Sequence, residues 1–77
     1  MSRLVDRPVP VGAAATGEPL SLNGETVLIL EAWRESGRWW LGEPERDFFR
    51  VQTRRGGLYE IARERGTGAW RLVRIFD

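Results

Sequence analysis

Turn signals that recur at short and regular intervals are the feature of this sequence that most restricts its fold. Glycine-containing turns at Asn23-Gly24, Gly37, residues 55–57 and residues 65–68 separate short runs of β-branched and aromatic residues. A spacing of about 8 to 12 residues between turns is typical of small antiparallel barrels and sandwiches. We therefore expect an all-β domain, a small antiparallel barrel or twisted meander of five to six strands that is SH3-like.

The first 20 residues differ in composition from the rest of the chain. Pro8, Pro10 and Pro19 lack the backbone donor that an interior strand needs, and small residues fill positions 12–17. We expect residues 1–20 to form an extended N-terminal arm, with a short strand near residues 4–11 and then a loop. Residues 20–77 are expected to form a single β domain.

The turns also predict which residues pair across neighbouring strands. Asn23-Gly24 predicts a two-residue hairpin, and the Trp39-Trp40 pair is placed in a short strand at residues 39–41. A three-residue turn at residues 55–57 would pair Arg54 with Leu58. A four-residue turn at residues 65–68 would pair Ile61 with Leu72. Because successive strand residues point to opposite faces, these registers predict one apolar core face. Its expected members are Phe49, Val51, Thr53, Tyr59, Ile61, Trp70, Leu72 and Phe76.

The composition excludes several kinds of catalytic and metal chemistry. The 77 residues include no cysteine and no histidine, which excludes Cys-based zinc sites, disulfides and catalysis that relies on His or Cys. Glu43, Glu45 and Asp47 alternate in one loop, but the glycine and terminal glutamate of a metal-binding loop are missing. We expect no enzyme activity and no cofactor. No apolar run approaches the roughly 18 residues of a membrane span, so the expected location is cytoplasmic.

The charged residues are balanced in number and unusual in kind. Twelve basic residues, all arginine, face eleven acidic residues and give a net charge of +1, which argues against unspecific nucleic-acid binding. Arginine makes planar bidentate contacts and stacks on aromatic rings, so an all-arginine set mixed with Trp and Phe suits a recognition surface. A GC-rich genome would produce the same richness in arginine.

The face opposite the predicted core mixes apolar and charged side chains, and it has two interpretations. Its arginines stand near Glu60 and Glu64, as in a solvated ladder of cross-strand salt bridges. Apolar residues rimmed by arginine also resemble an interface, which would bind a protein partner, a second copy of the chain or the N-terminal arm. The predicted partner-binding residues are Phe48, Arg50, Arg54, Leu58, Val73 and Ile75.

Arginines interleaved with aromatic residues predict an alternative function, the binding of single-stranded nucleic acid. In such proteins the bases stack on aromatic rings while arginines contact the phosphates. Neighbouring strand residues point to opposite faces, so either Trp39 or Trp40 must lie outside the core. The residues predicted for this function are Arg38, Trp39, Trp40, Arg46, Phe48, Arg50 and Arg54.

The second half of the chain carries a resemblance to a known family. The residues that carry it are Trp39-Trp40, Arg46, Phe48-Phe49-Arg50-Val51, Gly57, Tyr59-Glu60-Ile61, Trp70-Arg71-Leu72 and Ile75-Phe76-Asp77. This string resembles the small C-terminal domain of ImuB-type proteins, the inactive Y-family polymerase relatives of bacterial mutagenesis cassettes, and its standalone relatives. The resemblance implies a noncatalytic accessory module of DNA repair that contacts translesion-synthesis components or nearby nucleic acid.

Overall fold

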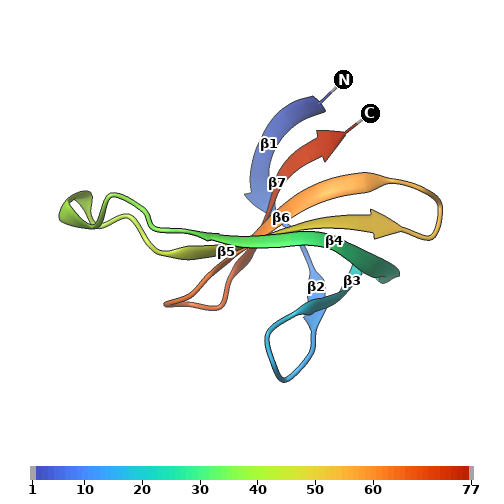
Figure 1. Ribbon diagram of the computed structural model, residues 1–77, viewed down its shortest axis with the longest axis horizontal. Coiled ribbons are helices and arrows are strands. Elements are labelled where there is room, and N and C mark those ends of the chain that lie inside the picture. The colour runs from blue at the N-terminus through green and yellow to red at the C-terminus, as the bar shows by residue number, and fades with distance from the viewer. Residues whose placement is uncertain (1, 77) are drawn as a thin grey trace.

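The computed structural model describes residues 2–76, apart from the side chain of Trp39. These residues form one antiparallel sheet of seven strands, in the order β1-β7-β6-β5-β4-β3-β2, which curls into a half-barrel (Figure 1). The predicted all-β class and small antiparallel barrel are confirmed, with seven strands in place of five to six. The elements are β1 (Ser2–Pro8), β2 (Val11–Ala13), β3 (Pro19–Leu22), β4 (Glu25–Glu35), the 3-10 helix η1 (Trp39–Leu41), β5 (Arg46–Thr53), β6 (Leu58–Glu64) and β7 (Trp70–Phe76).

The N-terminal arm supplies both edge strands of the sheet. β1 pairs with β7 and β2 pairs with β3, so two consecutive strands lie at opposite edges of the sheet and are joined only by Val9-Pro10. Such a link bridges about 11 Å, and the sheet must curl until its edges approach each other. The Val9 N–H donates to the Trp70 carbonyl at 3.4 Å, and the Asn23 N–H donates to the Pro10 carbonyl at 2.9 Å. The expected N-terminal arm thus contains two strands of the sheet, and it supplies side chains that pack against the core, namely Val5, Val9 and Val11.

The hairpin between β3 and β4 forms as predicted. Leu22 pairs with Glu25 across the turn. Asn23 and Gly24 have φ angles of 52° and 83°, which are the left-handed values that a two-residue hairpin turn of type I′ requires.

The hairpin between β5 and β6 keeps its predicted faces with a different register. Gln52, and not Arg54, pairs with Leu58. The turn is wider because Thr53 and Gly57 bond twice: the Thr53 N–H donates to the Gly57 carbonyl at 2.9 Å, and the Gly57 N–H donates to the Thr53 hydroxyl at 3.1 Å. A shift by two residues leaves every side chain on its face.

A β-bulge at Val73 changes the end of β7. Ile61 pairs with Leu72 as predicted, but Glu60 pairs with Arg74, which leaves Val73 as an extra residue. One extra residue exchanges the faces of all residues that follow it.

The bulge makes two predictions about the end of the chain wrong. Ile75, predicted for the outer face, packs against the core. Phe76, predicted for the core, lies on the outer face, where its ring contacts Arg50.

The core lies on the inner side of the curled sheet. Val51 and Ile61 have no exposed surface, and the ring of Phe49 lies against Trp70 with centroids 5.7 Å apart. The buried cluster consists of Leu22, Phe49, Val51, Ile61 and Leu72. No helix among the described residues is long and apolar enough to cross a membrane.

We expect Ile61→Ala to lower the free energy of unfolding by about 2 to 5 kcal/mol, because it leaves a cavity at a site without exposed surface. Leu4→Ala is the control, since Leu4 is 70% exposed and its truncation should change the free energy by less than about 0.5 kcal/mol. Urea denaturation measures both values. Equal losses in the two variants would contradict this placement of the core.

Candidate functional site

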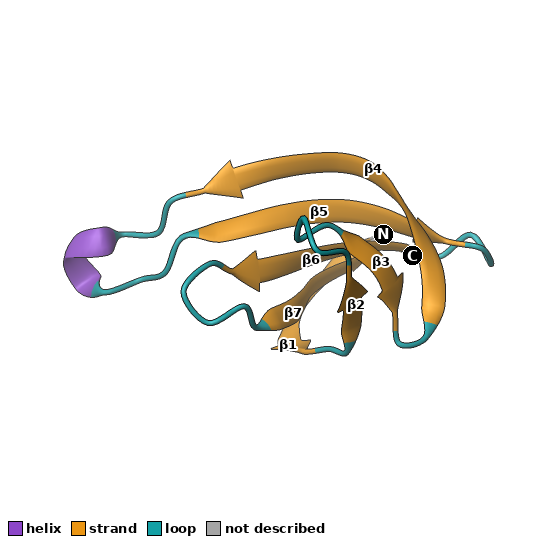
Figure 2. Cartoon of the chain, turned by 90° about the horizontal axis from the view of Figure 1, so that it is seen from below, coloured by secondary structure: helices purple, strands orange, loops and turns teal. Residues whose placement is uncertain are grey.

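The connection between β4 and β5 projects beyond the body of the sheet and carries η1 at its end (Figure 2). The two strands stay paired as far as Glu35 and Arg46, and we call residues 36–45 the tip. Trp40 is 65% exposed and Leu41 is 62% exposed. The tip therefore presents two adjacent large apolar side chains to solvent.

The tip corrects one prediction and answers one open question. Residues 39–41 form a turn of 3-10 helix, so the predicted short strand is wrong. Of the two neighbouring tryptophans, Trp40 is exposed, whereas the side chain of Trp39 lies outside the described residues.

An ion pair between Arg38 and Glu43 connects the residues that precede and follow η1. The Arg38 Nη2 donates to Glu43 Oε1 at 2.9 Å, and the Arg38 Nε and backbone N–H donate to Glu43 Oε2 at 3.2 and 2.8 Å. Such forked contacts are strong and directional. The hydrogen bonds from Arg38 hold the pKa of Glu43 below its ordinary value of 4.5. We call this pair the clamp.

The backbone of the tip is also tightly packed. The Leu41 N–H donates to the Arg38 carbonyl at 2.8 Å. A Cβ atom at Gly37 would lie 2.7 Å from the Glu43 Cβ and 2.8 Å from the Pro44 carbonyl oxygen. Only glycine fits there, so the tip is a compact and ordered loop.

A second group, on the outer face of the sheet, is made of stacked rings around one arginine. The rings of Trp33 and Phe48 are nearly parallel, with an interplanar angle of 10° and centroids 5.6 Å apart. The Arg50 Cζ lies 5.8 Å from the centroid of the Trp33 ring and 5.1 Å from that of the Phe76 ring. We call these four residues the Arg50 cluster. Phe48 is only 8% exposed, and the Nε of Arg50 is buried without a hydrogen-bond partner.

Ion pairs connect the strands across the outer face, as the salt-bridge interpretation predicted. Arg50 contacts Glu31 at 3.1 Å and Glu60 at 3.8 Å. Arg46 contacts Glu64 at 3.5 Å, and Arg74 contacts Glu60 at 3.9 Å.

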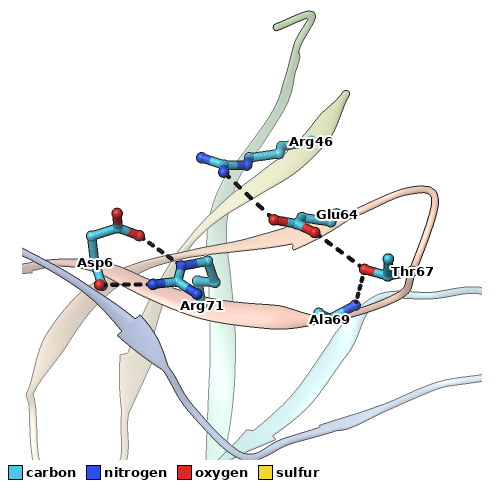
Figure 3. Close-up of polar contacts among 6 residues, drawn as sticks. All are labelled: Asp6, Arg46, Glu64, Thr67, Ala69 and Arg71. Atoms are coloured by element: carbon cyan, nitrogen blue, oxygen red, sulfur yellow. Dashed lines mark hydrogen bonds and ion pairs between the residues drawn. The ribbon is translucent and has the colours of Figure 1, made fainter. Parts of the chain in front are cut away.

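The first strand is fixed to the last by a further ion pair (Figure 3). The Arg71 Nε donates to the Asp6 carboxylate at 2.7 Å, and the Arg71 Nη2 donates to the Asp6 carbonyl at 2.9 Å. Asp6 has a φ of 48°, and it lies where the pairing of β1 with β7 shifts between Leu4 and Arg7. The double contact thus holds β1 at its irregular point.

The six residues predicted to bind a protein partner do not share one surface. Phe48 and Arg50 belong to the Arg50 cluster. Val73 is the bulged residue, and Ile75 packs against the core. The two remaining members are Leu58, which is half-buried, and Arg54, which is exposed in the turn after β5.

The residues predicted to bind nucleic acid are also divided. Arg38, Arg46 and Arg50 each contact a carboxylate. Arg54 has no ion pair with any described residue. A hollow of ≈ 290 Å³ at the base of the tip is lined by Arg38, Arg46 and Phe48, among others, but both of these arginines already contact carboxylates.

The alternating carboxylates of the tip and of β5 face arginines. Glu43 binds Arg38, while Arg34 lies 3.1 Å from Asp47 and 3.9 Å from Glu45. Within residues 2–76, no group of three or more acidic side chains could hold a metal ion.

Comparison with known proteins gives one match. Residues 24–77, more than half of the chain, match a family described as a domain of unknown function, DUF6504. The chain belongs to the DUF6504 family. The DUF6504 match begins at the turn before β4 and contains the tip, the Arg50 cluster and β5 to β7. No curated protein and no solved structure matches the chain.

We expect the clamp to depend on pH through Glu43. Because the pKa of this carboxyl is lowered, the clamp should be intact above the ordinary value of 4.5 and be lost as the pH falls through the lowered value. Carboxyl-carbon NMR shifts would follow the titration. The Arg38→Ala variant should raise the Glu43 pKa toward its ordinary value, because it removes the side-chain hydrogen bonds and keeps only the backbone one. A midpoint at or above 4.5 in the unchanged chain would contradict the clamp.

Proposed function

We propose that this chain is a cytoplasmic, noncatalytic protein-interaction module that contacts its partner through the tip. The observation that carries the proposal is the exposure of Trp40 and Leu41, at 65% and 62%, on a loop held by the clamp. Tryptophan is enriched among the residues that dominate binding energy at interfaces. A loop already ordered before binding loses less conformational entropy when the complex forms.

The tip is a better candidate than the outer face that the sequence indicated. In the Arg50 cluster each apolar or charged group already packs within the chain, whereas Trp40 and Leu41 expose most of their surface to solvent. The proposed contact residues therefore move from Phe48 to these two side chains.

The resemblance to the C-terminal domain of ImuB-type proteins supports a setting for this module. The resembling string includes the Trp39-Trp40 pair of the tip. We include in the proposal that the partner is a protein component of a translesion-synthesis assembly.

We expect Trp40→Ala to weaken binding to such a partner by about 30-fold or more, which corresponds to about 2 kcal/mol for the loss of an aromatic anchor. Isothermal titration with purified translesion-synthesis components measures the affinity. Leu4→Ala is the control, because it removes a 70% exposed leucine far from the tip in sequence. Both variants should melt like the unchanged chain, and equal affinity of Trp40→Ala and the unchanged chain would contradict the proposal.

The alternative function, single-stranded nucleic-acid binding, has a direct test. Carboxylates neutralise Arg38, Arg46 and Arg50, so we expect a fluorescent oligothymidine to bind weakly even at low salt, with a shallow salt dependence. Fluorescence anisotropy over a salt titration measures both. Tight binding that falls steeply with salt would instead favour the alternative, because phosphate contacts release counterions.

A further inference from the structure

Most of β4 has no neighbour on its outer edge. The strand is 11 residues long, but β3 pairs only Ser21 with Thr26 and Leu22 with Glu25. No other described strand lies on that side of β4 (Figure 2). From residue 27 onward the backbone N–H and C=O groups of this edge have no strand partner.

The other edges of the sheet carry features that block the addition of a strand. β1 ends in Pro8 and has a shift in register between Leu4 and Arg7. β2 has only three residues and directly follows Pro10. Prolines, bulges and short length are the usual means by which proteins protect edge strands.

The far half of β4 is protected in a similar way, but its near half is not. The pairing with β5 shifts between Ile29 and Glu31, which leaves Leu30 as the extra residue, and Arg34 and Glu35 add charges beyond the shift. Residues 27–30 read Val-Leu-Ile-Leu, with no charge and no proline, and only the last of them lies at the shift. We call residues 27–30 the open edge. Its two outward leucines, Leu28 and Leu30, are 64% and 46% exposed.

A hollow of ≈ 340 Å³ lies over the paired ends of β4 and β5, next to Leu28, and has a cation in its lining. Thr26, Leu28, Gln52 and Arg54 contribute to this lining. Arg54 has no ion pair among the described residues, unlike the arginines of the outer face. A group that fills this hollow would therefore be matched in charge if it carried a carboxylate.

Two registers of self-pairing with a second copy of the chain are unfavourable at the open edge. Antiparallel self-pairing centred between Leu28 and Ile29 would put residues 31–32 of the second copy opposite Thr26 and Glu25, where β3 already lies. Self-pairing centred on Glu31 avoids β3, but it places two Glu31 carboxylates opposite each other, and like charges across strands destabilise the pairing.

We propose that the open edge binds an extended segment of another protein by strand addition. The three regularly paired residues 27–29 span about 10 Å, and backbone hydrogen bonds would supply much of the affinity. Alternate side chains of the segment would be apolar, to pack beside Val27 and Ile29 on one face and Leu28 on the other. One acidic side chain would contact Arg54. This surface is separate from the tip and does not depend on the function proposed for it.

The probe is a phage-displayed library of random twelve-residue peptides, selected on the full chain. We expect enrichment of sequences that alternate apolar residues and contain an acidic one. Leu28→Lys should weaken the synthetic winning peptide at least tenfold, because a charged side chain would oppose its apolar residues at the open edge. Leu20→Lys is the matched control, since Leu20 is 55% exposed on the paired strand β3.

Three further changes test the backbone contacts, the charge contact and the independence of the open edge from the tip. N-methylation of alternate peptide amides should abolish binding, since it removes the backbone donors. Arg54 lies in an exposed turn, so Arg54→Glu should leave the fold intact. This variant should bind the acidic peptides at least tenfold more weakly, and it should keep its affinity for peptides in which lysine replaces the acidic residue. Trp40→Ala should bind the peptide like the unchanged chain, which keeps this result independent of the tip.

Several results would overturn the proposal. These are the absence of enriched peptides, equal binding by Leu28→Lys and the unchanged chain, tolerance of N-methylation, or loss of binding in Trp40→Ala. Sedimentation should show a monomer. A dimer that Leu28→Lys dissociates would assign the open edge to a second copy instead.

Discussion

The link Val9-Pro10 is the constraint on which the rest of the structure depends. It joins strands at the two opposite edges of the sheet, so the sheet cannot lie flat. The resulting curl encloses Val51 and Ile61 completely, a degree of burial that a single flat layer could not give to so short a chain. The DUF6504 match begins after this link, yet both edge strands of the half-barrel, β1 and β2, precede the matched residues.

The curl also determines where the arginine side chains lie and what they contact. The inner side is filled by apolar residues, and on the outer face neighbouring strands place arginines opposite carboxylates. Arg50 is the clearest case, with two ring contacts and two ion pairs. An all-arginine composition thus serves internal order on this face, because a planar guanidinium can stack and form ion pairs at the same time.

Local chemistry accounts for what the sequence predicted and for what it did not. The Asn23-Gly24 turn and the pairing of Ile61 with Leu72 follow from turn residues and alternation. The predicted pairing at Gln52 differs from the observed one by two residues, an even number, so the predicted faces are still correct. The bulge at Val73 could not be predicted, because residues 70–76 read as an unbroken strand. The sequence predicts a strand at residues 39–41, where a 3-10 helix forms, because Trp39-Trp40 favours a strand by composition. The contact that prevents it, between Arg38 and Glu43, joins residues on either side of the turn and is visible only once the loop is built.

The pairing of Ser2 with Phe76 has a consequence for how this fold can be used. The two ends of the described chain lie side by side, away from the tip (Figure 1). A domain with adjacent ends can be inserted into a loop of a larger protein, or fused at either end, with little disturbance to its own structure. A domain attached in this way would hold its tip outward, away from the point of attachment to the larger protein.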